Sequence, residues 1–357
     1  MKKLSSVRAK IDAVDGKILN LLNERARYVM QVWEIKAAEG RGTAAAFVPH
    51  RERQVLDRLV KMNQGPFPKE GVLAVFREIM SAGLALEGRP RVAYMGPPAT
   101  FSHRAALSKF GTQVEYVEVA GIPEVFAEVE QGRADLGVVP VENSSEGVIR
   151  HTLDLFIDSN LKVCSEVALP IKLCLMSKTG KVGPYQAIVS HPQPLAQARG
   201  WLDAHYAGVQ RREAPSTAYA ARAAERNSRI AVIGDQLAAE IYGLKVIAKN
   251  IQDKSDNMTR FYVIGHTVSQ PTGRDKTSIM LSVRDRVRAL ASVLQPFEAA
   301  NISLSSIESR PSRRRPWEYY FFIDFAGHQQ DKKVLKTLAI LKKRTVELKV
   351  LGSYPLA

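Results

Sequence analysis

The feature that most constrains this chain is an apolar stripe that recurs at three- and four-residue steps across residues 4–39. This spacing predicts one long amphipathic helix, which would measure about 50 Å at 1.5 Å per residue. Shorter helices are predicted at about 49–63, with a proline in the first turn, and at about 69–87. Three helices of such unequal length cannot close a compact core, so we expect this segment to pair with a second copy of the chain. The stripe comprises Leu4, Val7, Ile11, Val14, Ile18, Leu21, Leu22, Arg25, Val29, Val32 and Lys36.

A different pattern begins at Gly88-Arg89-Pro90, where short apolar strands start to alternate with helices. This alternation is typical of an open α/β domain, in which ligands bind at the carboxyl ends of strands. The strands are predicted near residues 92–95, 114–119, 136–142, 161–176, 186–190, 230–234 and 259–265, and helices near 123–131, 147–158, 192–205, 216–227 and 235–242.

A third pattern follows the linker Gln270-Pro271-Thr272-Gly273. Strands and helices there are predicted in the order βαββαβ, which is a ferredoxin-like unit. Its strands are expected at 278–283, 302–309, 318–325 and 348–354, and its helices at 285–300 and 331–344. We therefore expect a multidomain chain with an all-α domain at 1–89, an α/β domain at 90–268 and a ferredoxin-like domain at 274–357.

Composition narrows the class of protein. A chain of 357 residues, 45% hydrophobic and 24% charged, fits a globular protein of two or three domains. No apolar run approaches the roughly 20 residues that a bilayer span needs, and the first residues lack the apolar segment of a signal peptide. Two cysteines, Cys164 and Cys174, are too few for a disulfide framework. We therefore expect a cytoplasmic protein with no membrane partner.

The net charge of +15 lies mainly at the two ends of the chain. Residues 1–90 carry 16 basic and 10 acidic side chains, residues 91–270 carry 19 and 18, and residues 271–357 carry 16 and 8. A nucleic-acid-binding protein would show a concentrated basic stripe with interleaved aromatic residues. The nearly neutral middle segment argues against a nucleic-acid partner, and basic residues around pockets for small polyanions would add to the same total.

Several charged residues fall on helix faces of the first segment that should be buried. Buried cations need anions, and the internal acids are too few for all of them. Either an anionic ligand binds there, or some of these side chains lie at a rim and reach water. The residues are Arg8, Arg25, Lys36, Arg51, Glu52 and Glu87.

This pattern resembles the all-helical chorismate mutases over the whole segment, through VRAKIDAVDGKILNLLNERA, EIK, PHRERQVLDRL and GPFPKEGVLAVFREIMSAGLALE. The resemblance implies an intertwined dimer in which each long helix lends Arg8 to the partner's site. It also implies that Arg25 and Arg51 hold the two carboxylates of chorismate. Lys36 and Glu87 would serve its ether oxygen, and Glu52 would hold a hydroxyl. The chain departs from the family pattern at three positions, Trp33, Val48 and Gly83.

The middle segment resembles prephenate dehydratases, whose fold is periplasmic-binding-protein-like. The matching stretches are GPPATFSHRAA, VVPVENSSEGVI, VSHPQPLAQ, STAYAA, YGL and NMTRF. The resemblance implies that Thr259 acts on the leaving ring hydroxyl of prephenate, which needs a proton donor to depart. It implies neither a metal nor an organic cofactor. The expected substrate-binding residues are Ser102, Glu142, Asn143, Ser190, Gln197, Ser216, Thr217, Arg260 and Phe261.

The last segment resembles the ACT regulatory domains of these dehydratases. The motif ESRP stands at Glu308-Ser309-Arg310-Pro311, and in the family it forms part of a phenylalanine site between subunits. A companion motif, usually Gly-Ala-Leu-Val, reads Arg288-Ala289-Leu290-Ala291 here. The resemblance implies L-phenylalanine as an effector, bound near Ala289, Leu290 and the ESRP motif.

Other functions stay open from the sequence. The chain could be a dehydratase whose helical segment serves only as a dimerisation arm, or a non-enzymatic sensor of aromatic or amino acids that keeps the ligand-binding groups without needing Thr259. Arogenate could replace prephenate, since the two differ only at the side chain. The resemblances favour an enzyme of phenylalanine biosynthesis that forms at least a homodimer and carries both activities.

Overall fold

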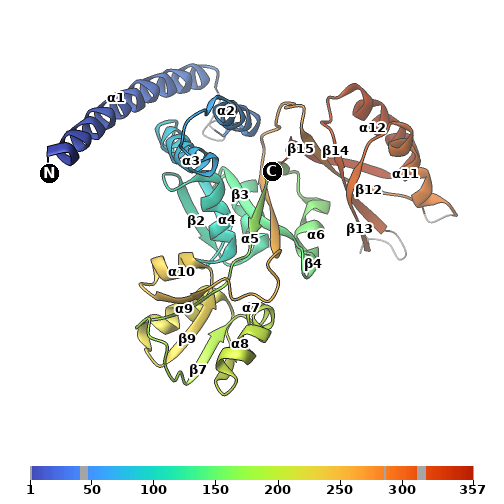
Figure 1. Ribbon diagram of the computed structural model, residues 1–357. Helices are drawn as coiled ribbons and strands as arrows, with labels where there is room; N and C mark the ends of the chain where they lie inside the picture. The colour runs from blue at the N-terminus through green and yellow to red at the C-terminus, as the bar shows by residue number, and fades with distance from the viewer. Residues whose placement is uncertain (1, 41–46, 285–286, 312–318, 357) are drawn as a thin grey trace.

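The computed structural model describes residues 2–40, 47–284, 287–311 and 319–356. Its N-terminal part consists of the helices α1 (Lys2–Ala38), α2 (Pro49–Met62) and α3 (Lys69–Leu86). The prediction of one long helix followed by two shorter ones is confirmed. Figure 1 shows α1 extending away from the rest of the molecule, with its first half in contact with no other element drawn there.

The apolar stripe on the first half of α1 is exposed within one chain. Leu4, Val7, Ile11, Val14 and Ile18 are each 49–58% exposed. The second half of α1 packs on α3, where Val29 lies near Gly83. A stripe of this length and apolar character needs a covering surface.

The middle part is a pair of lobes, each built around a sheet. The first sheet has the order β2-β1-β3-β11-β5, with the short β4 paired to β3. Its strands are β1 (Arg91–Met95), β2 (Glu115–Val119), β3 (Leu136–Asn143), β4 (Gly147–Val148), β5 (Lys162–Pro170) and β11 (Met258–Gly265), and its helices are α4 (Phe101–Phe110), α5 (Ile122–Glu130) and α6 (Arg150–Asp158).

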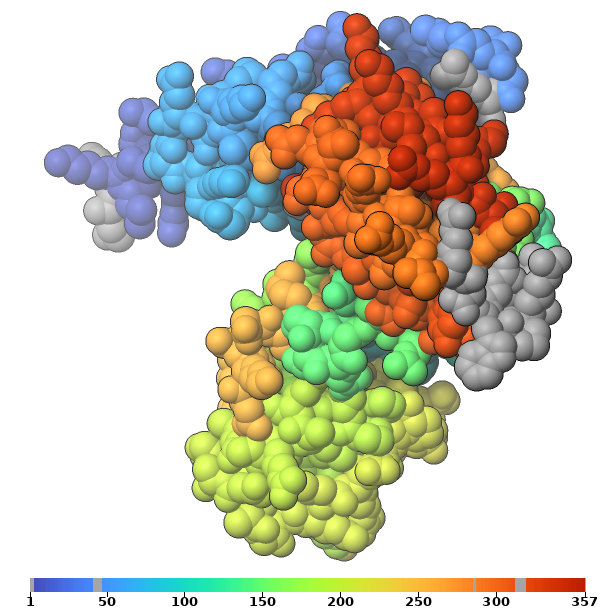
Figure 2. Space-filling model, turned by 90° about the vertical axis from the view of Figure 1, so that its right-hand side faces the viewer, coloured from blue at the N-terminus to red at the C-terminus, as the bar shows by residue number. Residues whose placement is uncertain are grey.

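The second sheet has the order β10-β6-β9-β7-β8, and its lobe protrudes below the rest in yellow-green (Figure 2). Its strands are β6 (Cys174–Ser177), β7 (Ala187–Ser190), β8 (Gln210–Glu213), β9 (Ile230–Gly234) and β10 (Lys245–Lys249), and its helices are α7 (Pro192–Gln197), α8 (Arg199–Tyr206), α9 (Thr217–Arg226) and α10 (Gln236–Ile241).

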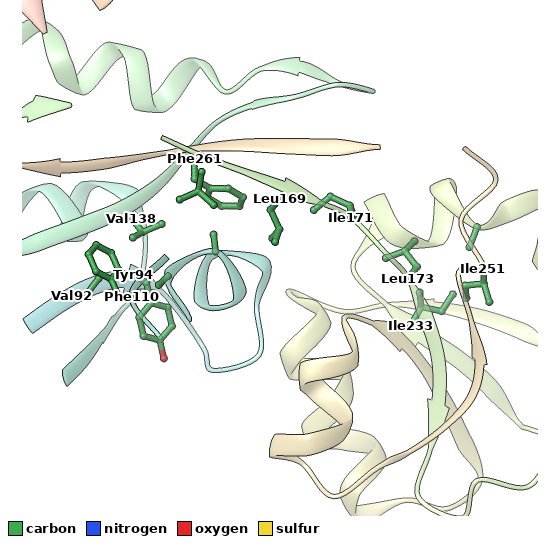
Figure 3. Packing of buried hydrophobic residues seen from close by; sticks show 14 of the residues in the cluster. Val92, Tyr94, Phe110, Val138, Leu169, Ile171, Leu173, Ile233, Ile251 and Phe261 are labelled. Atoms are coloured by element: carbon green, nitrogen blue, oxygen red, sulfur yellow. The ribbon is translucent and has the colours of Figure 1, made fainter. Parts of the chain in front are cut away.

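The chain crosses between the two lobes twice, from β5 to β6 and from β10 to β11. Two crossovers between two sheets are the expected periplasmic-binding-protein-like arrangement. Figure 3 shows Ile171 and Leu173 on one crossover and Ile251 on the other, between the apolar cores of the lobes. All three side chains are buried and belong to one apolar cluster, so the crossovers are packed segments and not free linkers.

The C-terminal part has the strands β12 (Asp275–Ser282), β13 (Leu304–Pro311), β14 (Tyr319–Ala326) and β15 (Glu347–Pro355), with the helices α11 (Ala289–Ala299) and α12 (Lys332–Arg344). The sheet order β13-β14-β12-β15 is that of a ferredoxin-like unit, as predicted. The predicted helix start at 285 and strand start at 318 lie outside the described residues.

One face of this C-terminal sheet packs on α11 and α12, and the other packs on the first lobe. Phe156 and Tyr262 of the lobe share a core with Phe322, Leu351 and Tyr354 of the C-terminal sheet. The approach is close at Gly352, where a Cβ atom would lie 2.1 Å from the carbonyl oxygen of Val163.

Three local predictions about the middle segment were wrong. The helix expected at 192–205 is broken between α7 and α8, because the carboxylate of Asp253 accepts hydrogen bonds from the backbone N–H groups of Gly200 and Trp201 at the start of α8. The short strands β8 and β10 were not expected, since β8 has no apolar residue and β10 has only three in a row between two lysines. The helix expected from 147 begins at Arg150, after β4.

Candidate active sites

The helical part contains a cavity of about 300 Å³. Five of the six residues expected there line it: Arg25, Lys36, Arg51, Glu52 and Glu87. Arg25 and Lys36 are eleven residues apart, about three helical turns, so both project from the same face of α1. The sixth, Arg8, lies in the exposed first half of α1, away from this cavity.

Two ion pairs cross the cavity. Lys36 Nζ lies 2.8 Å from Glu87 Oε2, which places an ammonium and a carboxyl at one end. Lys109 Nζ lies 2.8 Å from Glu52 Oε2. Burial lowers the pKa of the Arg25 guanidinium, an effect that the charge of Glu87 opposes. The cavity is therefore positive and partly dehydrated, which suits a small dianion.

The departures from the family pattern have limited effects on the cavity. Trp33 is not among the residues that line the cavity. Val48 does line it, and as the N-cap residue of α2 it gives no side-chain hydrogen bond. A Cβ atom on Gly83 would lie 3.5 Å from Arg25 Nη1, an ordinary contact.

The further residues of this cavity that were not predicted include Arg77, Lys109 and Phe110. Arg77 stands three, four and seven residues before Met80, Ser81 and Leu84 on α3, which also line the cavity, so helical spacing could have placed it on this face. Lys109 and Phe110 belong to α4 of the first lobe, and only the packing of the lobe on the helices brings them here.

A second cavity, of about 490 Å³, lies between the two lobes. The first lobe contributes the end of β3, the start of β11 and the start of α4, and the second contributes the starts of α7 and α9. Of the residues expected there, those that line it are Ser102, Asn143, Gln197, Ser216, Thr217, Thr259 and Phe261.

The amide of Asn143 connects Thr259 to the neighbouring backbone. Asn143 Oδ1 accepts hydrogen bonds from the backbone N–H groups of Ser145 (2.9 Å) and Glu146 (3.2 Å). Its Nδ2 therefore donates, to Thr259 Oγ1 at 2.8 Å and to Asn257 Oδ1 at 3.1 Å. Because Thr259 Oγ1 accepts from this amide, its own proton is available to a group in the cavity.

Two helix N-termini and one amide also face this cavity. Thr100 caps α4 and Ser216 caps α9, each accepting a hydrogen bond from a backbone N–H in its first turn. Helix N-termini attract carboxylates through unpaired N–H groups and the helix dipole. Gln197 Nε2 is buried in the wall with no hydrogen-bond partner among the described residues, so a ligand oxygen can satisfy it.

Three residues expected in this cavity have side chains directed elsewhere. The hydroxyl of Ser190 is fully buried and donates to the carbonyl of Ile233 at 2.7 Å. Arg260 and Glu142 pair with each other at 3.0 Å, outside the cavity lining. In β11 successive side chains alternate between faces, so Arg260 points away from the cavity that Thr259 and Phe261 enter. None of these three side chains lines the cavity in this structure.

Arg260 instead joins the first lobe to the C-terminal sheet. Its Nη1 donates to Asp324 Oδ2 at 2.6 Å and lies 3.6 Å from Glu166. Burial works to lower the pKa of Arg260, but the charges of Tyr262 and Asp324 outweigh it and hold that pKa above its usual value. Asp324 also accepts hydrogen bonds from Ser278 and Tyr262.

The expected effector residues lie on two elements of the C-terminal part. Arg310 of the ESRP motif makes a two-pronged contact with Asp154 of α6, at 2.8 Å for each bond, so it holds the dehydratase-like lobe. Glu308, Ser309 and Pro311 complete the end of β13, while Ala289 and Leu290 begin α11. Arg288 precedes α11 with φ 66°, a left-handed conformation that favours glycine.

Comparison with known proteins finds a matching family for each of the three parts of the chain. Family models for chorismate mutase type II, prephenate dehydratase and the ACT domain match residues 7–88, 92–269 and 277–342. A bifunctional chorismate mutase/prephenate dehydratase of Aquifex aeolicus is 44% identical over 100% of this chain and 99% of its own, and one of Stutzerimonas stutzeri is 45% identical over 99% and 98%.

A solved prephenate dehydratase of Arthrobacter aurescens, in complex with L-Phe, is 30% identical over 75% of this chain and 90% of its own, with a TM-score of 0.69. No helix in the described ranges is long and apolar enough to cross a bilayer. The matches cover the chain from end to end. The chain therefore belongs to the family of bifunctional chorismate mutase/prephenate dehydratases, and it rearranges chorismate to prephenate and converts prephenate to phenylpyruvate.

Proposed function

We propose that the cavity between α1, α2 and α3 is the mutase site. A Claisen rearrangement needs no nucleophile, so the residues have to bind a compact conformer and stabilise charge at the ether oxygen. Arg25 and Arg51 bind the two carboxylates, and the adjacent Lys36 and Glu87 serve the ether oxygen. Glu52 accepts from the ring hydroxyl. The placement of all five side chains around one positive cavity supports these roles.

Each mutase site takes its remaining cation, Arg8, from a second subunit. The first half of α1 carries Arg8 and an exposed apolar stripe, and both need a partner surface. Pairing of two α1 helices covers the stripe and brings Arg8 of each chain toward the other chain's cavity. The protein is thus a homodimer or a larger assembly of such dimers.

The cavity between the lobes is the dehydratase site, with Thr259 as the donor to the leaving hydroxyl. As this C–O bond breaks, the C–C bond to the ring carboxylate also breaks. Carbon dioxide leaves, the electrons of its C–C bond enter the ring, and hydroxide leaves as water with the Thr259 proton, which water then restores to Thr259. Aromatisation of the ring drives the step, so a weakly acidic hydroxyl is a sufficient donor.

The dehydratase cavity also has groups that can hold the substrate. Ser216, Thr217 and the N-terminus of α9 bind a carboxylate of prephenate, Ser102 lies at the N-terminus of α4, and Gln197 donates its unpaired amide N–H. Phe261 packs against the ring. The observation that carries the assignment is the hydrogen bond from Asn143 to Thr259, which leaves the Thr259 proton free for the cavity.

Thr259→Ala tests this assignment. Incubation of the pure variant with chorismate should accumulate prephenate, with phenylpyruvate formation reduced at least about 100-fold, since one positioned acid contributes roughly that much. Thr259→Ser keeps the hydroxyl and should retain most turnover. Normal phenylpyruvate formation by Thr259→Ala would remove Thr259 from the mechanism.

We also propose that L-phenylalanine binds the ACT part between subunits, near Ala289, Leu290 and the end of β13, and inhibits the dehydratase. The effector named for the Arthrobacter enzyme supports this, and the Arg310–Asp154 pair ties the ESRP motif to the dehydratase lobe. Calorimetric titration of the full chain with L-phenylalanine should give saturable heat, and D-phenylalanine should give much less. Equal or absent heats would contradict the proposal.

The proposal also includes the cellular location and the bounds of the three domains. The enzyme acts in the cytoplasm, where its two unpaired cysteines are stable. The three domains span residues 1–89, 90–268 and 274–357.

A further inference from the structure

Helix α4 connects the two cavities of one chain. Phe101 and Ser102 at its N-terminus line the cavity between the lobes, and Lys109 and Phe110 at its C-terminus line the mutase cavity. Ten residues at 1.5 Å each give a helix of about 15 Å. An element of the dehydratase therefore forms part of the mutase wall.

Lys109 is held firmly in that wall. Its ammonium lies 2.8 Å from Glu52 Oε2 and 5.5 Å above the ring of Phe47, and the Phe47 ring packs on Phe110 with centroids 4.9 Å apart. The side chains of Lys109 and Glu52 are only 18% and 17% exposed. Glu52 Oε2 has no well-aligned hydrogen bond in the described part of the chain. Lys109 and Glu52 therefore interact mainly through their charges, and the Glu52 carboxylate can still accept a hydrogen bond from a ligand.

The contact between α3 and the turn after α4 fixes this position. The carboxylate of Glu78 accepts hydrogen bonds from the backbone N–H and the hydroxyl of Thr112, at 3.1 and 2.7 Å. The hydroxyl of Ser81 accepts from the backbone N–H of Gln113 at 3.0 Å. At Gly111 a Cβ atom would lie 2.6 Å from Ser81 Cβ, so the two backbones approach as closely as glycine permits.

We propose that Lys109 is a positioning residue of the mutase: it orients Glu52 toward the chorismate hydroxyl and compensates its charge against the substrate dianion. Without Lys109, Glu52 would be a poorly solvated, unpaired carboxylate facing a doubly negative ligand. The repulsion would weaken substrate binding. The mutase site of each chain thus includes a residue of that chain's own dehydratase domain. This inference rests on the proposed assignment of the cavity to the mutase reaction.

Lys109→Met in the full chain tests the proposal, because methionine keeps the packing on Phe47 without the charge. The KM for chorismate should rise about tenfold while kcat changes less than about twofold, the pattern of lost ground-state binding. Lys109→Arg should restore KM to within about threefold of the wild type. Lys245→Met, which removes an exposed lysine from β10, is the matched charge control and should leave KM unchanged.

A double-mutant cycle separates action through Glu52 from a general effect. In a Glu52→Gln background no carboxylate remains to be positioned, so Lys109→Met should change KM by less than about threefold. An equal rise in both backgrounds, an unchanged KM in Lys109→Met, or a parallel loss of dehydratase turnover on added prephenate would each overturn the proposal.

Arg51→Met distinguishes failure of the inference from failure of the site assignment. Loss of chorismate turnover in Arg51→Met, together with normal KM in Lys109→Met, refutes only the role of Lys109. Retained turnover in Arg51→Met means that the cavity is not the mutase site, and the proposal for Lys109 is then refuted with it.

Discussion

At the scale of single residues, one amide sets the direction of the Thr259 proton. Asn143 is itself fixed by two backbone N–H groups that bind its oxygen, so only its nitrogen can face Thr259. The hydroxyl must then donate toward the cavity. If Thr259 is the proton donor, as proposed, Asn143 acts on the reaction through the orientation of its neighbour.

Asn143→Asp tests this orientation with almost no change in size. A carboxylate still accepts from the two backbone N–H groups, but it cannot donate to Thr259 and instead attracts that proton. Dehydratase kcat should fall about 100-fold, as expected when a catalytic group loses its alignment. Steady-state assays with prephenate measure this effect.

Asn257→Asp is the matched control. It adds the same charge beside the same amide, while its carboxylate still accepts from Asn143 Nδ2, and Asn257 Nδ2 has no hydrogen-bond partner to lose among the described residues. Its kcat should fall much less than that of Asn143→Asp. Equal losses would show that added charge alone causes the effect.

The sequence was a good guide to which residue types gather in each cavity and a poorer guide to where each side chain points. Thr259 and Arg260 are adjacent, and strand alternation alone implies that only one of them faces the cavity. Ser190 ends a strand as expected, but its hydroxyl binds the carbonyl of Ile233 in the neighbouring strand, a partner visible only after folding.

At the scale of elements, β11 has two functional faces. Thr259 and Phe261 face the cavity between the lobes, while Arg260 and Tyr262 face the C-terminal sheet. A displacement of that sheet would therefore act directly on the strand that carries Thr259, the proposed dehydratase donor.

Asp324→Asn should weaken this contact. The neutral amide loses the charge-assisted bond to Arg260, which is worth about 2 kcal/mol in a buried setting, although Glu142 and Glu166 still pair with the guanidinium. We expect the variant to have a lower midpoint of thermal unfolding than the wild type, as measured by circular dichroism. Asp203→Asn, which breaks the exposed pair with Arg211, should change the midpoint little. Equal midpoints for all three proteins would contradict the role given to Asp324.

Elements with strong periodicity were predictable and those defined by tertiary contacts were not. The long α1 and the βαββαβ order of the last domain follow from apolar spacing. The break between α7 and α8 does not, because its cause is the carboxylate of Asp253, about fifty residues away in the chain.

At the scale of the whole molecule, the exposed half of α1 supports the proposal that each mutase site is shared between subunits. Arg8 and Arg51 of one chain then serve different sites. A homodimer of chains that lack Arg8, or of chains that lack Arg51, has no intact site. In a dimer of one chain of each kind, both missing residues belong to the same site, and the other site is intact.

Co-expression of Arg8→Ala and Arg51→Ala chains should therefore recover mutase activity. Random pairing makes half of the dimers mixed, and each mixed dimer has one intact site, so about a quarter of wild-type activity is expected. Each homodimer alone should be nearly inactive. Activity in the mixture no greater than the mean of the two homodimers would mean that Arg8 serves its own chain.

The order of the three domains could be predicted from the sequence, but the contacts between them could not. The sequence around Lys109 does not predict its place in the helical cavity, because Lys109 reaches that cavity only when the turn at Gly111 docks on α3.

That docking turn has a consequence for recombining genes of this family. The obvious joint is Gly88-Arg89-Pro90, yet the surfaces that must match are Glu78 and Ser81 on one side and 109–113 on the other. A chimera with its crossover at Gly88-Arg89-Pro90 would take one of these surfaces from each parent. A chimera with its crossover after residue 113 would take both surfaces from the same parent. We therefore expect chimeras that take residues 1–113 from one parent to keep mutase activity better than chimeras joined at Gly88-Arg89-Pro90.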